Sequence, residues 1–153
     1  MSGRSTLYDA MVAALGTTTF PNASTESINY VTRSLEDWWD WTPDHFPGVR
    51  VVDKTEEKKP LAYFGTTDTH DMESFVEFEV VGYVQDVTND GINTKRSTLI
   101  ADIERIVMTS STVSAACGDI WPLTVETDEG VIDGHGMCSV TFRARYFYNH
   151  SGP

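Results

Sequence analysis

The sequence predicts an α+β fold, with a four-stranded, mainly antiparallel sheet packed on one face by two helices. Two segments, 5–15 and 93–110, carry apolar residues at helical spacing. Two others, 72–86 and 137–148, alternate in the two-residue period of strands. The strands are joined as hairpins, with one helix crossing over. The length favours a single domain, 1–153.

The first helix is expected over residues 5–15, STLYDAMVAAL. Ser5 or Thr6 can cap its start, and Gly16 can end it in the left-handed conformation. Its apolar stripe consists of Leu7, Tyr8, Met11, Val12 and Leu15.

The segment 24–41 is ambiguous. Ile28, Val31 and Leu35 have near-helical spacing, but the Ser, Thr and β-branched residues around them disfavour a helix. Pro43 and Pro47 end whatever forms there, because each favours an extended conformation in the residue before it.

A short strand is then expected over 48–55, followed by a charged, exposed connector, EEKKP, at 56–60. In the long strand 72–86 one face is apolar and the other mixes acidic with aromatic residues. The first face holds Val76, Phe78, Val80, Gly82 and Val84, and the second holds Phe75, Glu77, Glu79, Val81 and Tyr83.

The second helix is expected to begin after Asn93 or Thr94 and to run to about Ser110. The next ten residues read as a loop. The strand after it contains Pro122, which lacks a backbone donor, so this strand lies at the sheet edge or begins after the proline. A last strand over 137–148 closes the fold.

The composition excludes several classes of function. A net charge of −12 disfavours nucleic-acid binding, which needs cationic side chains against phosphates. No apolar run approaches the roughly 18 residues of a membrane span, and the start of the chain does not read as a secretory signal. Cys117 and Cys138 fit two buried thiols better than a disulfide.

The sequence gives no evidence for catalysis. The four histidines are scattered, and a metal site built on His135 and Asp133 is a weak alternative, because short His/Asp loops are common on acidic surfaces. Nucleophile motifs and phosphate-binding loops are absent. We therefore expect no catalytic residues, no metal ligands and no cofactor.

Trp38, Trp39 and Trp41 lie within four residues, among acids. In a helix Trp38 and Trp41 share a face, and in a strand Trp39 and Trp41 do. Either way one large ring reaches the surface. An exposed tryptophan with an acidic rim is typical of a protein–protein interface; core closure and small-ligand stacking are the alternatives.

Arg143 and Arg145 project from the last strand, opposite the face that holds Val140 and Phe142. They either lie solvated near Glu77 and Glu79 or form a contact between subunits, where arginine is favoured.

The order of these elements resembles the tail terminator (tail completion) proteins of long-tailed bacteriophages. The resemblance covers roughly residues 5–148. It rests on FPGVRVV (46–52) before the first strand, LIADIERIV (99–107) in the helix, and a last strand ending in RARYFY (143–148). The acidic, tryptophan-rich segment is longer and more aromatic than the family pattern.

The resemblance implies a virion structural protein of the tail or neck, assembled in the host cytoplasm. It implies a homo-hexameric ring that caps the head-proximal end of the tail tube, stops polymerisation and presents a joining surface to the head-side connector or stopper protein. DNA would pass through the lumen without specific binding, which suits an acidic ring. The family has no catalytic residues to carry over.

Two other functions remain open. One is a different neck, connector or tail tube protein of the same assembly. Tube subunits usually need a long hairpin loop to stack, and residues 53–72, the only candidate for it in the sequence, are too charged to favour this role. The other is a small α+β enzyme or ligand-binding domain with an aromatic pocket built from Trp38, Trp41 and Tyr83.

Overall fold

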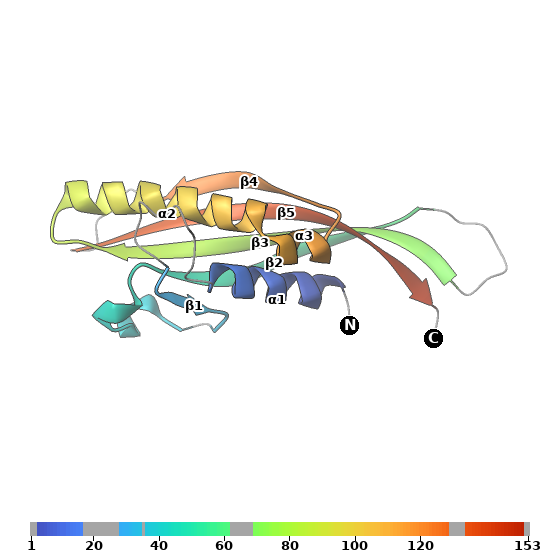
Figure 1. Cartoon of the computed structure of the whole chain (residues 1–153), viewed down its shortest axis with the longest axis horizontal. Coiled ribbons are helices and arrows are strands. Elements are labelled where there is room, and N and C mark those ends of the chain that lie inside the picture. The colour runs from blue at the N-terminus through green and yellow to red at the C-terminus, as the bar shows by residue number, and fades with distance from the viewer. Residues whose placement is uncertain (1–2, 17–27, 35, 62–68, 129–133, 152–153) are drawn as a thin grey trace.

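The computed structural model describes residues 3–16, 28–34, 36–61, 69–128 and 134–151. Figure 1 shows the chain as a long sheet with helices along it. In chain order the elements are α1 (Gly3–Leu15), β1 (Tyr30–Thr32), the 3-10 turns η1 (Trp38–Asp40) and η2 (Pro43–His45), β2 (Gly48–Pro60), β3 (Thr69–Gln85), α2 (Asn89–Thr109), α3 (Ser111–Ala116), β4 (Asp119–Thr127) and β5 (His135–Ser151).

The sheet has five strands in the order β1-β2-β3-β5-β4. The strand β1 pairs with β2 in parallel, and the other three pairings are antiparallel. The α+β class and the mainly antiparallel sheet are confirmed. The expected four strands and two helices are corrected to five strands and three α-helices in the described part of the chain. The additional strand is only three residues long and lies in the ambiguous segment, where no alternation could reveal it.

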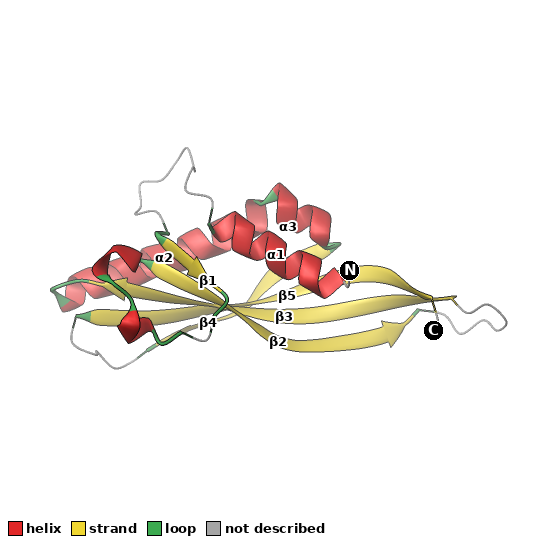
Figure 2. Cartoon of the chain, turned by 90° about the horizontal axis from the view of Figure 1, so that it is seen from below, coloured by secondary structure: helices red, strands yellow, loops and turns green. Residues whose placement is uncertain are grey.

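The three α-helices cover one face of the sheet (Figure 2). Their apolar side chains meet the predicted apolar face of β3, and Phe78 and Phe142 are completely buried between the layers. Helix α1 begins at Gly3 and ends at the predicted residue, and its apolar stripe is buried apart from the half-buried Val12. This layer is the main core of the protein.

The second face of the sheet is covered at one end only. There Trp41, Val81 and Tyr83 form a small separate core, against which Tyr30, Trp38, Phe46 and Val52 pack. Along the rest of this face, charged and aromatic side chains alternate across β2, β3 and β5. Among the described residues, nothing therefore covers the part of this sheet face that lies beyond the small core.

The expected connector at 56–60 is wrong, because these residues belong to β2. The strand runs from Gly48 to Pro60 and stays paired with β3 as far as Pro60 opposite Met72, with a register shift between Asp53 and Glu56. Its lysines pair within the strand, Lys58 with Glu56 and Lys59 with Glu57. Glu57 also pairs with Arg143 of β5, so charge does not prevent strand formation. Figure 2 shows the hairpin continuing beyond the helices.

Helix α2 begins at Asn89, five or six residues before the predicted start. The hydroxyl of Thr88 accepts a hydrogen bond from the Gly91 N–H at 3.0 Å and caps the helix. The ten residues expected as a loop contain helix α3, because Ser110 accepts from the Val113 N–H and starts a new helical turn.

Strand β4 lies at the sheet edge, as Pro122 predicted, but it begins before the proline at Asp119. A register shift beside Pro122 accommodates the missing donor. Cys117 and Cys138 are buried free thiols, as expected. Among the described residues no helix is both long enough and apolar enough to cross a membrane.

Candidate protein–protein interface

Residues 36–47, here called the aromatic segment, fold as two consecutive 3-10 turns. In η1 the Trp41 N–H donates to the Trp38 carbonyl at 3.1 Å, and in η2 the Phe46 N–H donates to the Pro43 carbonyl at 3.3 Å. Thr42, before Pro43, is extended, so the chain cannot continue as one helix. The two tight turns therefore keep this short segment packed against the sheet.

The three tryptophans occupy three different environments. Trp41 is 8% exposed and meets the ring of Tyr83 edge-on, with centroids 5.2 Å apart. Trp38 is half-buried and stacks on the same tyrosine, with centroids 5.8 Å apart and an interplanar angle of 22°. Trp39 is 63% exposed and lies at the edge of the cluster, where its ring centroid is 5.1 Å from that of Trp38.

This division follows from helical periodicity. A 3-10 turn repeats every three residues, so positions i and i+3 lie on the same side and position i+1 is turned away. Trp38 and Trp41 consequently face the sheet, and Trp39 faces solvent, as the helical alternative in the sequence required. An interface role for the three residues stays a prediction.

Two histidines belong to this cluster: His45, for which the sequence suggested no role, and His135, for which it suggested only a weak metal-site alternative. The ring of His45 stacks on Tyr30 with centroids 4.1 Å apart, and the ring of His135 lies 4.9 Å from that of Trp38. His135 also approaches Phe46 at 5.3 Å. Its place opposite Gln85 in the β3–β5 ladder puts it under the aromatic segment, which no local sequence signal could indicate.

The aromatic segment carries four exposed carboxylates, on Glu36, Asp37, Asp40 and Asp44. Glu36 accepts a hydrogen bond from the Tyr30 hydroxyl at 3.0 Å. Most acids on the sheet are paired with cations, but in the described part of the chain these four form no ion pair. Trp39 thus lies among four carboxylates that no described ion pair neutralises.

Arg143 and Arg145 lie on the uncovered sheet face, opposite the buried Val140 and Phe142, as predicted. Arg143 pairs with Glu57 at 3.3 Å and with Glu77 at 3.6 Å. Its guanidinium also lies 5.0 Å from the centroid of the Phe75 ring. We call the surface around Arg143 and Arg145 the arginine face. From the sequence Glu77 and Glu79 were expected near these arginines, and of the two only Glu77 pairs with Arg143.

Arg145, two residues further along β5, also lies between carboxylates and an aromatic ring. It pairs with Asp119 of β4 and with Glu73 of β3, the latter at 3.7 Å. Its guanidinium lies 5.4 Å from the centroid of the exposed Phe147 ring. Both arginines are therefore held by cross-strand ion pairs and by aromatic faces.

The aromatic segment and the arginine face are separate surfaces. Trp38 and Trp41 rest on Tyr83, whereas Arg143 pairs with Glu77, six residues earlier in β3. Six residues of strand span roughly 20 Å. The structure thus brings the three tryptophans together and the two arginines together, but not the two groups with each other.

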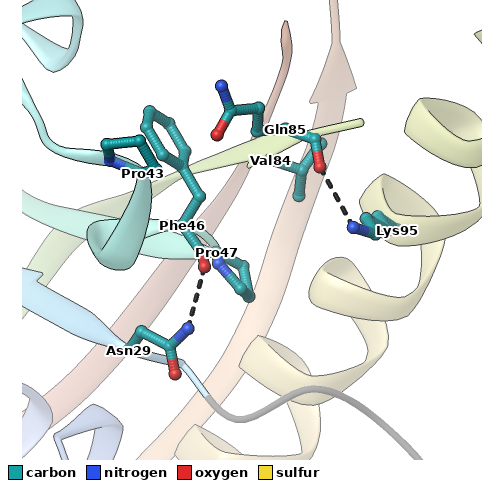
Figure 3. Close-up of a pocket in the computed structure, with 7 residues that line it drawn as sticks. All are labelled: Asn29, Pro43, Phe46, Pro47, Val84, Gln85 and Lys95. Atoms are coloured by element: carbon teal, nitrogen blue, oxygen red, sulfur yellow. Dashed lines mark hydrogen bonds between the residues drawn. The ribbon is translucent and has the colours of Figure 1, made fainter. Parts of the chain in front are cut away.

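A cavity of about 420 Å³ opens beside the aromatic segment (Figure 3). The Lys95 ammonium, on its wall, donates to the Gln85 carbonyl at 3.1 Å and pairs with Asp86 at 3.2 Å. The lining residues are Asn29, Pro43, Phe46, Pro47, Val84, Gln85 and Lys95. It is not the pocket of Trp38, Trp41 and Tyr83 that the sequence suggested, because those three rings pack against one another.

The described residues offer little that could bind a metal ion or act as a nucleophile. No three His, Cys, Asp or Glu side chains there are placed to hold a metal ion. Asp133, the proposed neighbour of His135, lies outside the described residues. Burial raises the pKa of the Cys138 thiol to about 12, so that group is a poor nucleophile at neutral pH.

No protein-family model matches the sequence, and no curated protein matches it. One solved structure that is similar is a chain of the virion of a native gene transfer agent particle. The two are 13% identical and superpose with a TM-score of 0.44, over 95% of this chain and 94% of that one. A TM-score this low does not establish a common fold, so the functional proposal rests on the residues of this chain.

Proposed function

We propose that this protein is a virion structural protein, a tail terminator that assembles as a ring on the head-proximal end of a phage tail tube. Bound there, it occupies the open edge of the last tube ring and presents a surface of different chemistry to the head side. Addition of tube subunits then stops, because the outward surface does not match them. The protein acts by contact alone.

The observation that carries the proposal is the partly covered sheet. A sheet face of a single soluble domain is normally covered along its length or lined by polar residues alone. Here the uncovered part displays Phe75 and Phe147 beside Arg143 and Arg145, and aromatic residues and arginine are both enriched in interfaces between subunits. The element order supports the same conclusion through its resemblance to tail terminators.

The charge distribution also supports a ring around DNA. Among the described residues every Lys and Arg except Arg50 forms an ion pair with a carboxylate, and in the whole sequence the acids exceed the cations by 12. A ring of such protomers repels phosphates, so DNA would pass through its lumen without being held.

Adding the protein to the polymerising tube protein of the same virion tests the proposal. Negative-stain microscopy should show tubes that stop growing, with a ring at one end only. Unchanged tube lengths would overturn it. A matched variant, Arg143→Glu, places like charges beside Glu57 and Glu77 and should abolish capping, whereas Arg105→Glu on α2, on the helix-covered side, should not.

A tail tube protein is the second candidate, because one observation favours it. The β2–β3 hairpin is long and reaches past the helices, which is the feature that tube subunits use for stacking. The purified protein would then form long tubes by itself. Such tubes in negative stain would establish this candidate and exclude the terminator.

A further inference from the structure

We propose that Trp39 and the carboxylates beside it form a docking surface for an arginine-bearing segment of a partner protein. The proposal deepens the proposed function, on which it rests for the existence of a virion partner, by naming the chemistry that the partner brings. It is carried by the exposure of Trp39, by its support from beneath, and by the unpaired acids around it.

The ring of Trp39 lies at the outer edge of the aromatic cluster, tilted by 59° against the ring of Trp38. Below it Trp38 contacts Trp39 at 5.1 Å and Tyr83 at 5.8 Å, and Tyr83 belongs to the buried end of β3. A ring supported in this way loses little freedom when a ligand covers it, which favours binding. Its 63% exposure leaves a large part of the indole free for a partner.

The charges beside Trp39 point to a cation. Asp37 and Asp40 flank it in the sequence, and Glu36 and Asp44 complete four exposed carboxylates within nine residues. In the described part of the chain none of the four meets a Lys or Arg, although nearly every cation of the protein is paired elsewhere. The carboxylates therefore remain available to an external cation.

Arginine fits this surface better than lysine. Its planar guanidinium stacks on an indole face while its N–H groups donate to carboxylates. The arginine face of the same protein shows this combination: Arg143 lies 5.0 Å from the Phe75 ring and pairs with two glutamates. The aromatic segment offers the ring and the acids of such a site without the cation.

The test uses two peptides, (Gly-Arg)4 and the isosteric, uncharged (Gly-citrulline)4, titrated into the full-length protein. The indole N–H signals of the four tryptophans are followed by NMR, and the Trp39 signal is assigned by its loss in Trp39→Ala. The arginine peptide should shift the Trp39 signal, and the citrulline peptide should not. Equal shifts with both peptides, or arginine-induced shifts elsewhere that spare Trp39, would overturn the proposal.

Two variants separate the ring from the acids. Trp39→Ala should weaken binding of the arginine peptide roughly two- to five-fold, the contribution of one exposed cation–π contact. Leu123→Ala, which truncates another exposed apolar residue, should not change it. Weakening by both variants to the same extent would contradict a specific site.

Asp37→Asn/Asp40→Asn should also weaken binding and flatten its dependence on salt. The Asp37 side chain makes no capping hydrogen bond, so η1 should keep its fold. Asp90→Asn/Glu104→Gln removes the same charge from α2 and should leave binding unchanged. If both double variants weaken binding equally, general acidity explains it and the site is refuted.

Two further outcomes complete the test. A Trp39 signal that moves with protein concentration alone would identify a second copy of this chain as the occupant and overturn the proposal. Failure of tube capping together with arginine-specific shifts at Trp39 would refute the terminator function and leave the docking surface standing. The two claims are thus distinguishable.

Discussion

The hydroxyl of Tyr146 donates a hydrogen bond to Oε1 of Glu56 at 2.5 Å, and this bond ties β5 to β2 across the intervening strand. The hydroxyl of Ser74, on β3 between them, donates to the same oxygen at 2.7 Å. Arg4 of α1 lies 3.6 Å from the other carboxylate oxygen. One carboxylate therefore joins three strands and the first helix.

Tyr146→Phe should lower the free energy of unfolding by about 1–2 kcal/mol. The variant removes a part-buried hydrogen bond to a charged group and leaves Ser74 as the remaining hydroxyl donor. Urea unfolding measures the effect. Tyr148→Phe, on the same strand, is the control and should be near neutral; equal costs for both variants would contradict the assigned role.

The same site predicts an acid-dependent loss of stability. Burial alone would raise the Glu56 pKa, but the hydrogen bonds from Tyr146 and Ser74 and the charges of Lys58 and Arg4 bring the pKa below its ordinary value of 4.5. A pKa that is lower in the folded state stabilises the protein above the unfolded value, and this stability is lost as the pH falls below about 4.5 through the folded pKa.

Glu56→Gln should therefore unfold with a shallower pH dependence than the wild type below pH 4.5. Urea unfolding between pH 3 and pH 7 measures the slopes. Glu104→Gln, whose carboxylate makes no ion pair in the described structure, should follow the wild type. An unchanged slope in Glu56→Gln would refute the linkage.

The stability of the protein at alkaline pH depends on Tyr146 itself. Burial and the hydrogen bond with Glu56 raise its pKa from 10.0 to about 12. A raised pKa contributes stability that is complete below pH 10 and is lost as the pH rises toward 12. Tyr146→Phe should lack this component, and the comparison of its unfolding curves at pH 9 and pH 11 with the wild type tests it.

Gly82→Ala should destabilise the protein by about 1–3 kcal/mol. A Cβ at Gly82 would lie 2.6 Å from Cδ2 of Leu99, so either the Leu99 side chain or α2 itself would have to move away from β3. In a Leu99→Ala background the added cost of Gly82→Ala should fall, because the colliding atom is gone. Additive effects in this double-mutant cycle would contradict the close packing.

Trp41→Ala and Trp39→Ala should have opposite consequences. Trp41 fills the small core over Tyr83, so its truncation should cost about 3–5 kcal/mol of stability. Trp39→Ala should fold with nearly wild-type stability and lose tail attachment instead. Chemical unfolding combined with tail binding separates the two; a destabilised Trp39→Ala would assign that residue to the core.

The sequence predicted the elements in which a repeating pattern extends over several turns or pleats. The stripe of α1, the alternation of β3 and β5 and the edge position of Pro122 all follow from local rules. It failed for β1 and α3, because three and six residues are too few for a period. It also failed for the second half of β2, where ion pairs within the strand and with Arg143 of β5 replaced the usual apolar alternation.

The candidate site was predictable in part. The exposure of one tryptophan follows from the spacing of Trp38, Trp39 and Trp41. The position of Arg143 and Arg145 on one and the same sheet face follows from the two-residue period of a strand. The contact between the rings of His135 and Trp38 was not predictable, because it depends on which strands are neighbours. The same holds for the roughly 20 Å between the two surfaces, which only the sheet register supplies.

The central claim is that this chain works by ring assembly and surface contact at a tube end. Mass photometry of the pure protein, with and without short tail tubes, tests it most directly. We predict that tubes gain mass once, by six 17.0-kDa chains at one end, and that the gain saturates. Mass that keeps increasing with added protein, or no gain at all, would contradict the account.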